Sequence, residues 1–156
     1  MNVPIHDGER MTLDTSALLC HLNEWESASP AAHVVVDGLI ATGRCDAIVS
    51  AATVAELLVQ PIRRGRAVAA ATIGFLDSLE ELQIRSTDFL VAAEAARIRA
   101  ETSIPLPDAI VIATAVLTSS QVLVTNDRRL AEAARQAVPQ LRVIVLSEVA
   151  AVSSAT

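Results

Sequence analysis

Four acidic side chains stand where an α/β fold would bring them together. Asp14 ends the first predicted strand, and Asp127 follows a later strand by two residues. Glu56 lies on the helix that leaves the second predicted strand, and Asp108 opens a strongly apolar helix. Because sites in open parallel sheets form at the carboxyl ends of the strands, we expect these four side chains to converge.

Mutual repulsion limits what such a cluster can do. Two unit charges at 4 Å repel by roughly 4 kcal/mol at an effective dielectric of 20, so four carboxylates cannot all ionise unaided. An all-oxygen ligand set without His or Cys suits Mg²⁺ or Mn²⁺ rather than zinc. These ions support hydrolysis of phosphate esters by a metal-activated water, with one or two ions about 3.5–4 Å apart.

Each acid also has a purely structural interpretation. Asp14 is placed to cap the next helix, Asp108 suits a helix start, and Asp127 suits a turn or a cap. Glu56 completes the spacing of a capping box. Against that role, Ser50 beside the strand end is the better cap candidate. The conjunction of four acids at one end of one sheet is what these interpretations leave unexplained.

Polar and basic residues surround the predicted site. The hydroxyl and amide residues beside the acids would orient waters or carboxylates, or serve as ordinary helix caps: Thr15, Ser16, Thr125 and Asn126. Two arginine groups would bind RNA phosphates or form solvated faces: Arg63, Arg64 and Arg66, and Arg128 and Arg129. The second group is favoured because it follows the last acid directly.

Composition excludes several classes of function. The 156-residue chain is 52% hydrophobic and 2% aromatic, so it has a core but no aromatic platform for stacking bases. A net charge of −6 argues against a simple polyanion-binding protein. All 12 basic residues are arginine, which excludes Walker-A nucleotide binding, Schiff-base chemistry and a lysine-dependent phospho-receiver site. No G-x-G-x-x-G fingerprint is present.

Cysteine, histidine and terminal segments add little chemistry. Cys20 and Cys45 form no C-x-x-C pair and are expected to be buried hydrophobes. The three histidines, His6, His21 and His33, show no metal-binding spacing with them. The first ten residues lack the apolar region of a signal peptide, and we find no continuous membrane span. We expect a soluble, cytoplasmic protein.

Apolar periodicity predicts alternating strands and helices. The predicted strands are 11–14, 46–49, 83–85, 121–125 and 142–146, and the predicted helices are 15–23, 31–43, 51–60, 63–82, 87–101, 108–117 and 128–136. Pro61 is expected to stop the third helix, with Thr87 or Ser86 capping the fifth. This alternation predicts a parallel sheet between helical layers, in one domain at 11–147. Residues 1–10 would form an extension and 148–156 a tail that is loose from Ala150.

Four segments together resemble the PIN-domain ribonucleases, and the VapC toxins of toxin–antitoxin modules in particular. These segments are LDTSALL at 13–19, TVAELL at 53–58, LPDAIVIATA at 106–115 and LVTNDR at 123–128, and the resemblance extends over about 11–146. It implies a three-layer α/β/α sandwich around a parallel sheet of four to five short strands. It also implies divalent-metal-dependent endoribonuclease activity with Asp14, Glu56, Asp108 and Asp127 as the acidic site. Ser16 matches the family's hydroxyl after the first acid.

The resemblance further implies partners, and it leaves alternatives. Family members typically form homodimers and are silenced by an antitoxin whose tail covers the acidic groove. This chain departs from the pattern in its first ten residues and in Ser119 and Ser120, where glycine is usual. One alternative is a catalytically silent PIN-like module that binds RNA or protein. Another is a haloacid-dehalogenase-type phosphatase, although that mechanism needs a second Asp where Ser16 stands.

Overall fold

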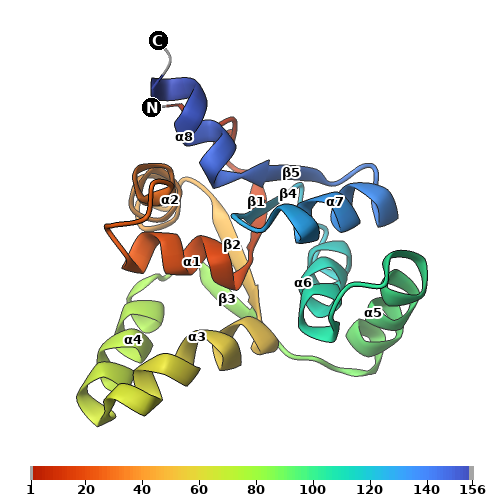
Figure 1. Ribbon diagram of the computed structural model, residues 1–156, viewed down its shortest axis with the longest axis horizontal. Helices are drawn as coiled ribbons and strands as arrows, with labels where there is room; N and C mark the ends of the chain where they lie inside the picture. Colours follow the sequence, from red (N-terminus) through yellow and green to blue (C-terminus); the bar gives the residue numbers. More distant parts are fainter. Residues whose placement is uncertain (1, 155–156) are drawn as a thin grey trace.

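Short apolar strands separated by helices fold into a five-stranded, all-parallel sheet in the computed structural model, which describes residues 2–154. The strand order is β3-β2-β1-β4-β5 (Figure 1). The strands are β1 (Arg10–Leu13), β2 (Asp46–Ser50), β3 (Leu82–Arg85), β4 (Val122–Thr125) and β5 (Arg142–Val145). The predicted parallel sheet is confirmed.

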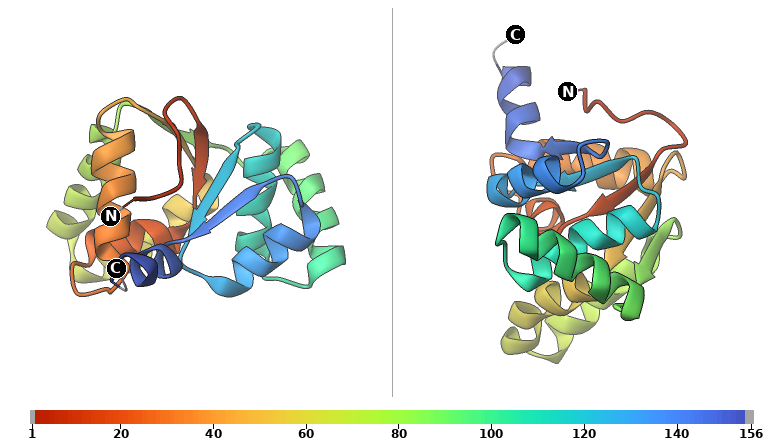
Figure 2. Two further views of the ribbon diagram at one scale, coloured as in Figure 1. Left: turned by 90° about the horizontal axis from the view of Figure 1, so that it is seen from above. Right: turned by 90° about the vertical axis from the view of Figure 1, so that its right-hand side faces the viewer.

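Helices cover both faces of this sheet, as Figure 2 shows. The helices are α1 (Thr15–Leu22), α2 (Ser29–Val35), the π-helix η1 (Val36–Ile40), α3 (Ala51–Arg64), α4 (Arg66–Ser78), α5 (Phe89–Thr102), α6 (Leu106–Leu117), α7 (Arg128–Ala137) and α8 (Leu146–Ser154). One core cluster joins the sheet to α1, α2, η1 and α4, and a second joins it to α5, α6 and α7. Because α3 contacts both α1 and α6, it links the two layers.

The strands carry apolar residues on both sides because both sides are covered. Met11 and Leu13 of β1 belong to one core cluster, and Leu123 of β4 belongs to the other. Every residue of β4 is buried, which confirms the prediction made from its lack of alternation.

The strand order reverses direction between β1 and β4. The chain runs outward from β1 through β2 to β3 and then returns to the other side of β1 as β4. Ligand sites of open α/β sheets form at such a switch point, outside the carboxyl ends of the strands. The backbone N–H of Asp14, directly after β1, donates to the carbonyl of Val124 at 3.0 Å. Asp14 and the residues after β4 therefore lie next to each other at this point.

Two helix boundaries differ from the predictions because α3 ends at a glycine and not at the proline. Helix α3 continues through Pro61 to Arg64, so the predicted stop at Pro61 is wrong. Gly65 follows with φ = 123°, a conformation that other residues rarely adopt, and α4 begins immediately after it. Arg63 and Arg64 therefore end one helix, and Arg66 starts the next.

Other boundaries shift by local capping. Helix α5 is capped by Asp88, whose Oδ1 accepts from the N–H of Val91 at 3.0 Å, and not by Thr87 or Ser86 as predicted. Helix α6 begins two residues early, with Pro107 in its first turn, where a missing N–H costs nothing. The predicted helix 31–43 is divided into α2 and η1.

Both terminal segments are structured over the described residues. Val3 and Ile5 are buried in the core, and residues 2–9 precede β1. The predicted loose tail is wrong up to Ser154, because α8 extends to that residue. Residues 1, 155 and 156 lie outside the described part.

No helix of the described chain meets the requirements of a membrane span by itself. Within residues 2–154, none is both long enough and apolar enough to cross a membrane. In the same range, α5 and α6 reach that length and composition when taken together, but they meet at a bend of 118°.

Candidate active site

Asp14 is the buried centre of the site. It is only 5% exposed, and one of its oxygens, Oδ2, accepts hydrogen bonds from the hydroxyl of Ser16 at 2.5 Å and of Thr125 at 2.8 Å. The backbone N–H of Ser16 also approaches Oδ2 at 3.3 Å, so Asp14 caps α1 as predicted. The other oxygen, Oδ1, has no hydrogen-bond partner within the described residues.

Asp127 likewise uses one carboxylate oxygen for hydrogen bonds and leaves the other without a partner in the described residues. Its Oδ1 caps α7 by accepting from the backbone N–H groups of Arg129 at 2.7 Å and Leu130 at 3.3 Å. Its own N–H donates to the hydroxyl oxygen of Thr125 at 2.9 Å. Thr125 is fully buried and therefore connects the two aspartates through one oxygen atom. Oδ2 of Asp127 makes no hydrogen bond with any residue that the structure describes.

The predicted supporting residues play different parts. Ser16 and Thr125 contact the Asp14 carboxylate directly, and Ser16 also accepts from the backbone N–H of Asn126 at 2.8 Å. The side-chain oxygen of Asn126 instead accepts from the N–H of Ser147 at the start of α8, at 3.0 Å. Asn126 therefore ties α8 to the loop that carries the site.

Glu56 enters the site from α3. The helix is capped by Ser50, whose Oγ accepts from the N–H of Thr53 at 2.9 Å, which confirms Ser50 as the cap. The capping-box interpretation of Glu56 is thus wrong. Oε2 of Glu56 accepts from the hydroxyl of Thr15 at 2.8 Å, which joins α3 to α1. Oε1 has no partner in the described structure.

Asp108 shows that the four acids converge electrostatically. It lies partly buried in the first turn of α6, and within residues 2–154 its carboxylate makes no hydrogen bond or ion pair. Burial raises the pKa of Asp108 from 3.8 to about 6, assisted by the negative charges of Asp14, Asp127 and Glu56. Arg129 acts in the opposite direction but does not outweigh them.

The arrangement leaves negative oxygens available for a cation. Three of the acids use one oxygen each for a cap or a hydroxyl contact, and Asp108 uses none. A structural role and a ligand role are therefore compatible in the same side chain. No three of these carboxylates have ligand oxygens that all lie within 4.8 Å of one another, as far as the chain is described, so three of them can hold one ion only if their side chains move closer together. An all-oxygen set of this kind fits a hard divalent cation.

The five predicted RNA-binding arginines are all exposed. Arg128 and Arg129 open α7, where a positive charge opposes the helix dipole, and neither forms an ion pair within the described residues. Their positions favour an external anion over a structural role. Arg63 and Arg64 end α3, where the dipole is favourable to them, and Arg66 begins α4.

One group of candidate metal ligands was not predicted from the sequence. His21, His33 and Asp37 come together away from the four acids, with ligand atoms that all lie within 4.8 Å of one another. Only the spacing of four residues between His33 and Asp37 was visible as a helical pair. The approach of His21 depends on how α1 packs against α2, which the local sequence pattern does not specify.

The family model of the PIN domain matches residues 11–136. A sequence comparison with curated proteins gives no significant match.

Several solved structures are similar in fold. The chain resembles VapC20 of Mycobacterium tuberculosis, described as a sarcin-ricin loop cleaving toxin, with a TM-score of 0.63 and 17% identity over 79% of this chain and 94% of that one. It resembles the FitAcB structure of Neisseria gonorrhoeae with a TM-score of 0.65 and 25% identity over 87% and 97% of the chains. A toxin–antitoxin complex from Klebsiella pneumoniae gives a TM-score of 0.64 and 20% identity over 87% and 97%.

Proposed function

The chain belongs to the PIN domain family, and from this premise we propose that it is a divalent-metal-dependent endoribonuclease that acts in the cytoplasm as the toxin of a type II toxin–antitoxin module. The observation that carries the proposal is the convergence of four carboxylates at the switch point of the sheet. Its clearest sign is the pKa of Asp108, which burial and the other three negative charges raise to about 6. The ionised form of Asp108 is stabilised when a cation neutralises the neighbouring carboxylates.

We assign the metal to Asp14, Glu56, Asp108 and Asp127, with Mg²⁺ or Mn²⁺ as the ion. The donor set supports this choice because it contains only oxygen. A divalent cation held there would polarise an RNA phosphodiester and lower the pKa of the attacking water.

The surrounding residues keep these ligands in place. Ser16 and Thr125 fix the orientation of Asp14 through Oδ2 and leave Oδ1 for the ion. Thr15 does the same for Glu56 through Oε2. Because these hydrogen bonds set the carboxylate positions before substrate arrives, less reorganisation is needed during the reaction.

Exposed arginines are the proposed contacts to the RNA backbone. Arg128 and Arg129 directly follow Asp127, so phosphates bound by them would lie beside the carboxylates. Arg63, Arg64 and Arg66 supply a second basic group around the turn between α3 and α4. Local positive charge of this kind compensates for the net charge of −6.

Two apolar surfaces support the proposed protein partners, an antitoxin and a second copy of the chain. A groove of about 590 Å³ runs between α1, α3 and α4, and its apolar lining includes Leu19, Leu22 and Leu57. Helix α3 contributes Leu57 to this groove and Glu56 to the acidic site, so we propose the groove as the seat of an antitoxin segment whose continuation covers the acids. Phe89 is 83% exposed at the start of α5 and the adjacent Leu90 is 60% exposed, so the two side chains offer apolar surface to a second copy. A homodimer is the form we propose.

RNA cleavage assays test the proposed activity. We expect cleavage with Mg²⁺ or Mn²⁺, its loss in EDTA, and its loss in Asp14→Asn, which retains the capping oxygen. Asp77→Asn is the matched control, because Asp77 is exposed on α4, away from the site. Cleavage that survives both EDTA and Asp14→Asn would contradict the proposal. RNA binding without cleavage in either ion would instead favour the catalytically silent module.

A further inference from the structure

A second cluster of metal-binding side chains lies at the other end of α1. His21 stands in the last turn of α1, His33 in α2 and Asp37 in η1. Nε2 of His21 is 2.9 Å from Oδ1 of Asp37, and Nδ1 of His33 is 2.6 Å from Oδ2. Helix α1 separates this cluster from Asp14 by about 10 Å along its axis, so the two sites are distinct.

We propose that His21, His33 and Asp37 form a binding site for a transition-metal ion of the zinc class. Two imidazole nitrogens and a carboxylate oxygen are a ligand set suited to Zn²⁺, Co²⁺ or Ni²⁺, and a poor one for Mg²⁺. Three protein ligands leave a further coordination position for water. This site does not depend on nuclease activity at the carboxylate cluster.

Packing holds the two rings close together before any ion binds. The ring of His21 stacks on Phe75 of α4 with centroids 5.0 Å apart and planes at 17°. The ring of His33 lies 4.5 Å from that of His21. The other nitrogen of His21, Nδ1, is buried without a partner in the described part of the chain. The one polar contact of this ring therefore faces Asp37.

Access is provided by the other two ligands. The His21 side chain is only 10% exposed, but those of His33 and Asp37 are 40% and 57% exposed. Within residues 2–154, the Asp37 carboxylate contacts the two histidine rings and forms no ion pair with an arginine. Its carboxylate therefore has no permanent positive partner that an incoming ion would have to displace.

The π-helix supplies a second, independent indication. Short π-turns occur often at functional sites, because the additional residue in the turn changes which side chains share a face. In η1, the N–H of Ala41 donates to the carbonyl of Val36 at 2.8 Å, which closes the wide turn. Leu39 and Ile40 remain buried while Asp37 meets the two histidines. An irregular turn is thus maintained around the proposed ligand.

Metal titration of the full-length, EDTA-stripped chain tests the site. In excess Mg²⁺, which competes for the carboxylate cluster, we expect one tightly bound equivalent of Zn²⁺, and Co²⁺ should give visible absorption bands typical of mixed nitrogen and oxygen ligands. His33→Gln should weaken Zn²⁺ binding at least about tenfold, as expected for a damaged metal site. This variant is preferred to a change at His21, whose burial makes loss of folding a risk.

His6→Gln is the matched control, because His6 is exposed on the N-terminal segment. It should bind Zn²⁺ like the wild type and show the same rise in Tm on adding Zn²⁺, whereas His33→Gln should lose that rise. If His33→Gln binds Zn²⁺ unchanged, the ion lies elsewhere and the proposal is wrong. If the wild type binds no Zn²⁺ and His33→Gln only lowers Tm, the three residues are a hydrogen-bonded clamp and the proposal is equally overturned.

Discussion

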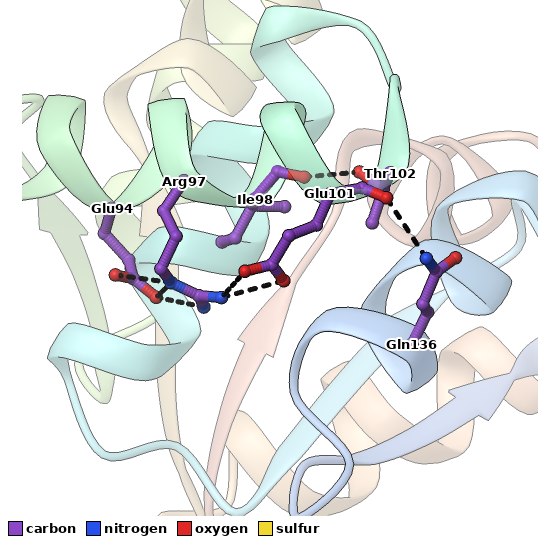
Figure 3. A network of polar contacts seen from close by, with 6 residues as sticks. All are labelled: Glu94, Arg97, Ile98, Glu101, Thr102 and Gln136. Carbon is purple, nitrogen blue, oxygen red and sulfur yellow. Dashed lines mark hydrogen bonds and ion pairs between the residues drawn. The ribbon is translucent and has the colours of Figure 1, made fainter.

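Two groups of acidic side chains in this molecule are held in opposite ways. On α5, Arg97 lies between Glu94 and Glu101 and donates hydrogen bonds of 2.6–3.2 Å to both carboxylates (Figure 3). At the strand ends, the four carboxylates of the candidate site receive hydroxyl and backbone N–H donors or, at Asp108, none. No arginine forms an ion pair with them in the part of the chain that the structure describes.

The electrostatic consequences differ accordingly. Hydrogen bonds to Glu94 and Glu101 raise the pKa of Arg97, since the charged form is stabilised. Burial and like charges raise the pKa of Asp108 to about 6, since its charged form is destabilised. In the α5 network, the charge of Arg97 already balances its carboxylate neighbours. Among the four acids, the mutual repulsion is reduced only when a proton or a cation binds. This difference is what the proposed metal-binding role of the four acids would explain.

The largest effect is expected from supplying the site with its own cation. Glu56 is exposed on α3, so Glu56→Arg would fold and would place a guanidinium beside the other three acids. The guanidinium would repel the divalent cation, and the loss of several kcal/mol of transition-state stabilisation by that cation corresponds to a fall in the RNA cleavage rate of roughly 100-fold or more. Glu56→Gln is the control that removes charge without adding any. Full activity in Glu56→Arg would mean that the four acids do not act together.

A smaller effect is expected on stability from Asp108→Asn. The pKa of Asp108 is higher in the folded chain than its ordinary 3.8, so the folded form keeps the proton longer. The contribution of Asp108 to wild-type stability should therefore be lost as pH rises from about 4 to about 6 and then stay constant. The variant should avoid this loss and be more stable than the wild type at pH 7 by about 1–2 kcal/mol, after allowance for solvent screening.

Urea unfolding at pH 4 and pH 7 without divalent ions measures this difference. Asp77→Asn should show no such pH-dependent gain, because Asp77 is exposed on α4. An Asp108→Asn variant with the same stability as the wild type at both pH values would show that its charge is not destabilised.

A further prediction concerns RNA affinity and the two arginines that follow Asp127, which form no ion pair with the four acids in the described structure. Reversing both Arg128 and Arg129 to Glu, in an Asp14→Asn background that cannot cleave, should weaken binding. For each phosphate that the variant no longer binds, the slope of log affinity against log salt should fall by about 0.7 for single strands. Arg135→Glu, later on the same helix, is the control. An unchanged slope in the double variant would remove these arginines from the RNA-binding surface.

The smallest effect is expected from the complete network on α5. Arg97→Gln removes an exposed, salt-screened pair of ionic interactions, so the free energy of unfolding should fall by no more than about 1 kcal/mol. RNA cleavage should be unchanged. A strong decrease in cleavage by this variant would contradict the separation of the two regions.

The sequence was sufficient to predict that the four acids come near one another, as the joint effect of Asp14, Asp127 and Glu56 on the pKa of Asp108 indicates. Their role as metal ligands stays a prediction. Asp14 and Asp127 each follow a buried strand, and parallel strands end at the same edge of a sheet. Their second function as helix caps was also visible, but only as an alternative to a ligand role. The structure shows that a cap uses one oxygen and leaves the other available, which only atomic contacts reveal.

The rest depended on packing between segments. The continuation of α3 past Pro61 reflects tertiary support that overrides the local tendency of proline to end a helix. The hydrogen bond from Thr15 to Glu56 requires α1 and α3 to meet side by side. The cluster of His21, His33 and Asp37 likewise arises where α1 meets α2, and no spacing in the sequence marks all three residues.

The most direct test of the uncompensated cluster is a ¹³C NMR titration of the Asp108 side-chain carboxyl, assigned by its absence in Asp108→Asn. In EDTA, we expect a pKa of about 6. Saturating Mg²⁺ should lower it, because the cation neutralises the neighbouring carboxylates. A pKa near the ordinary 3.8, unaffected by Mg²⁺, would contradict the account.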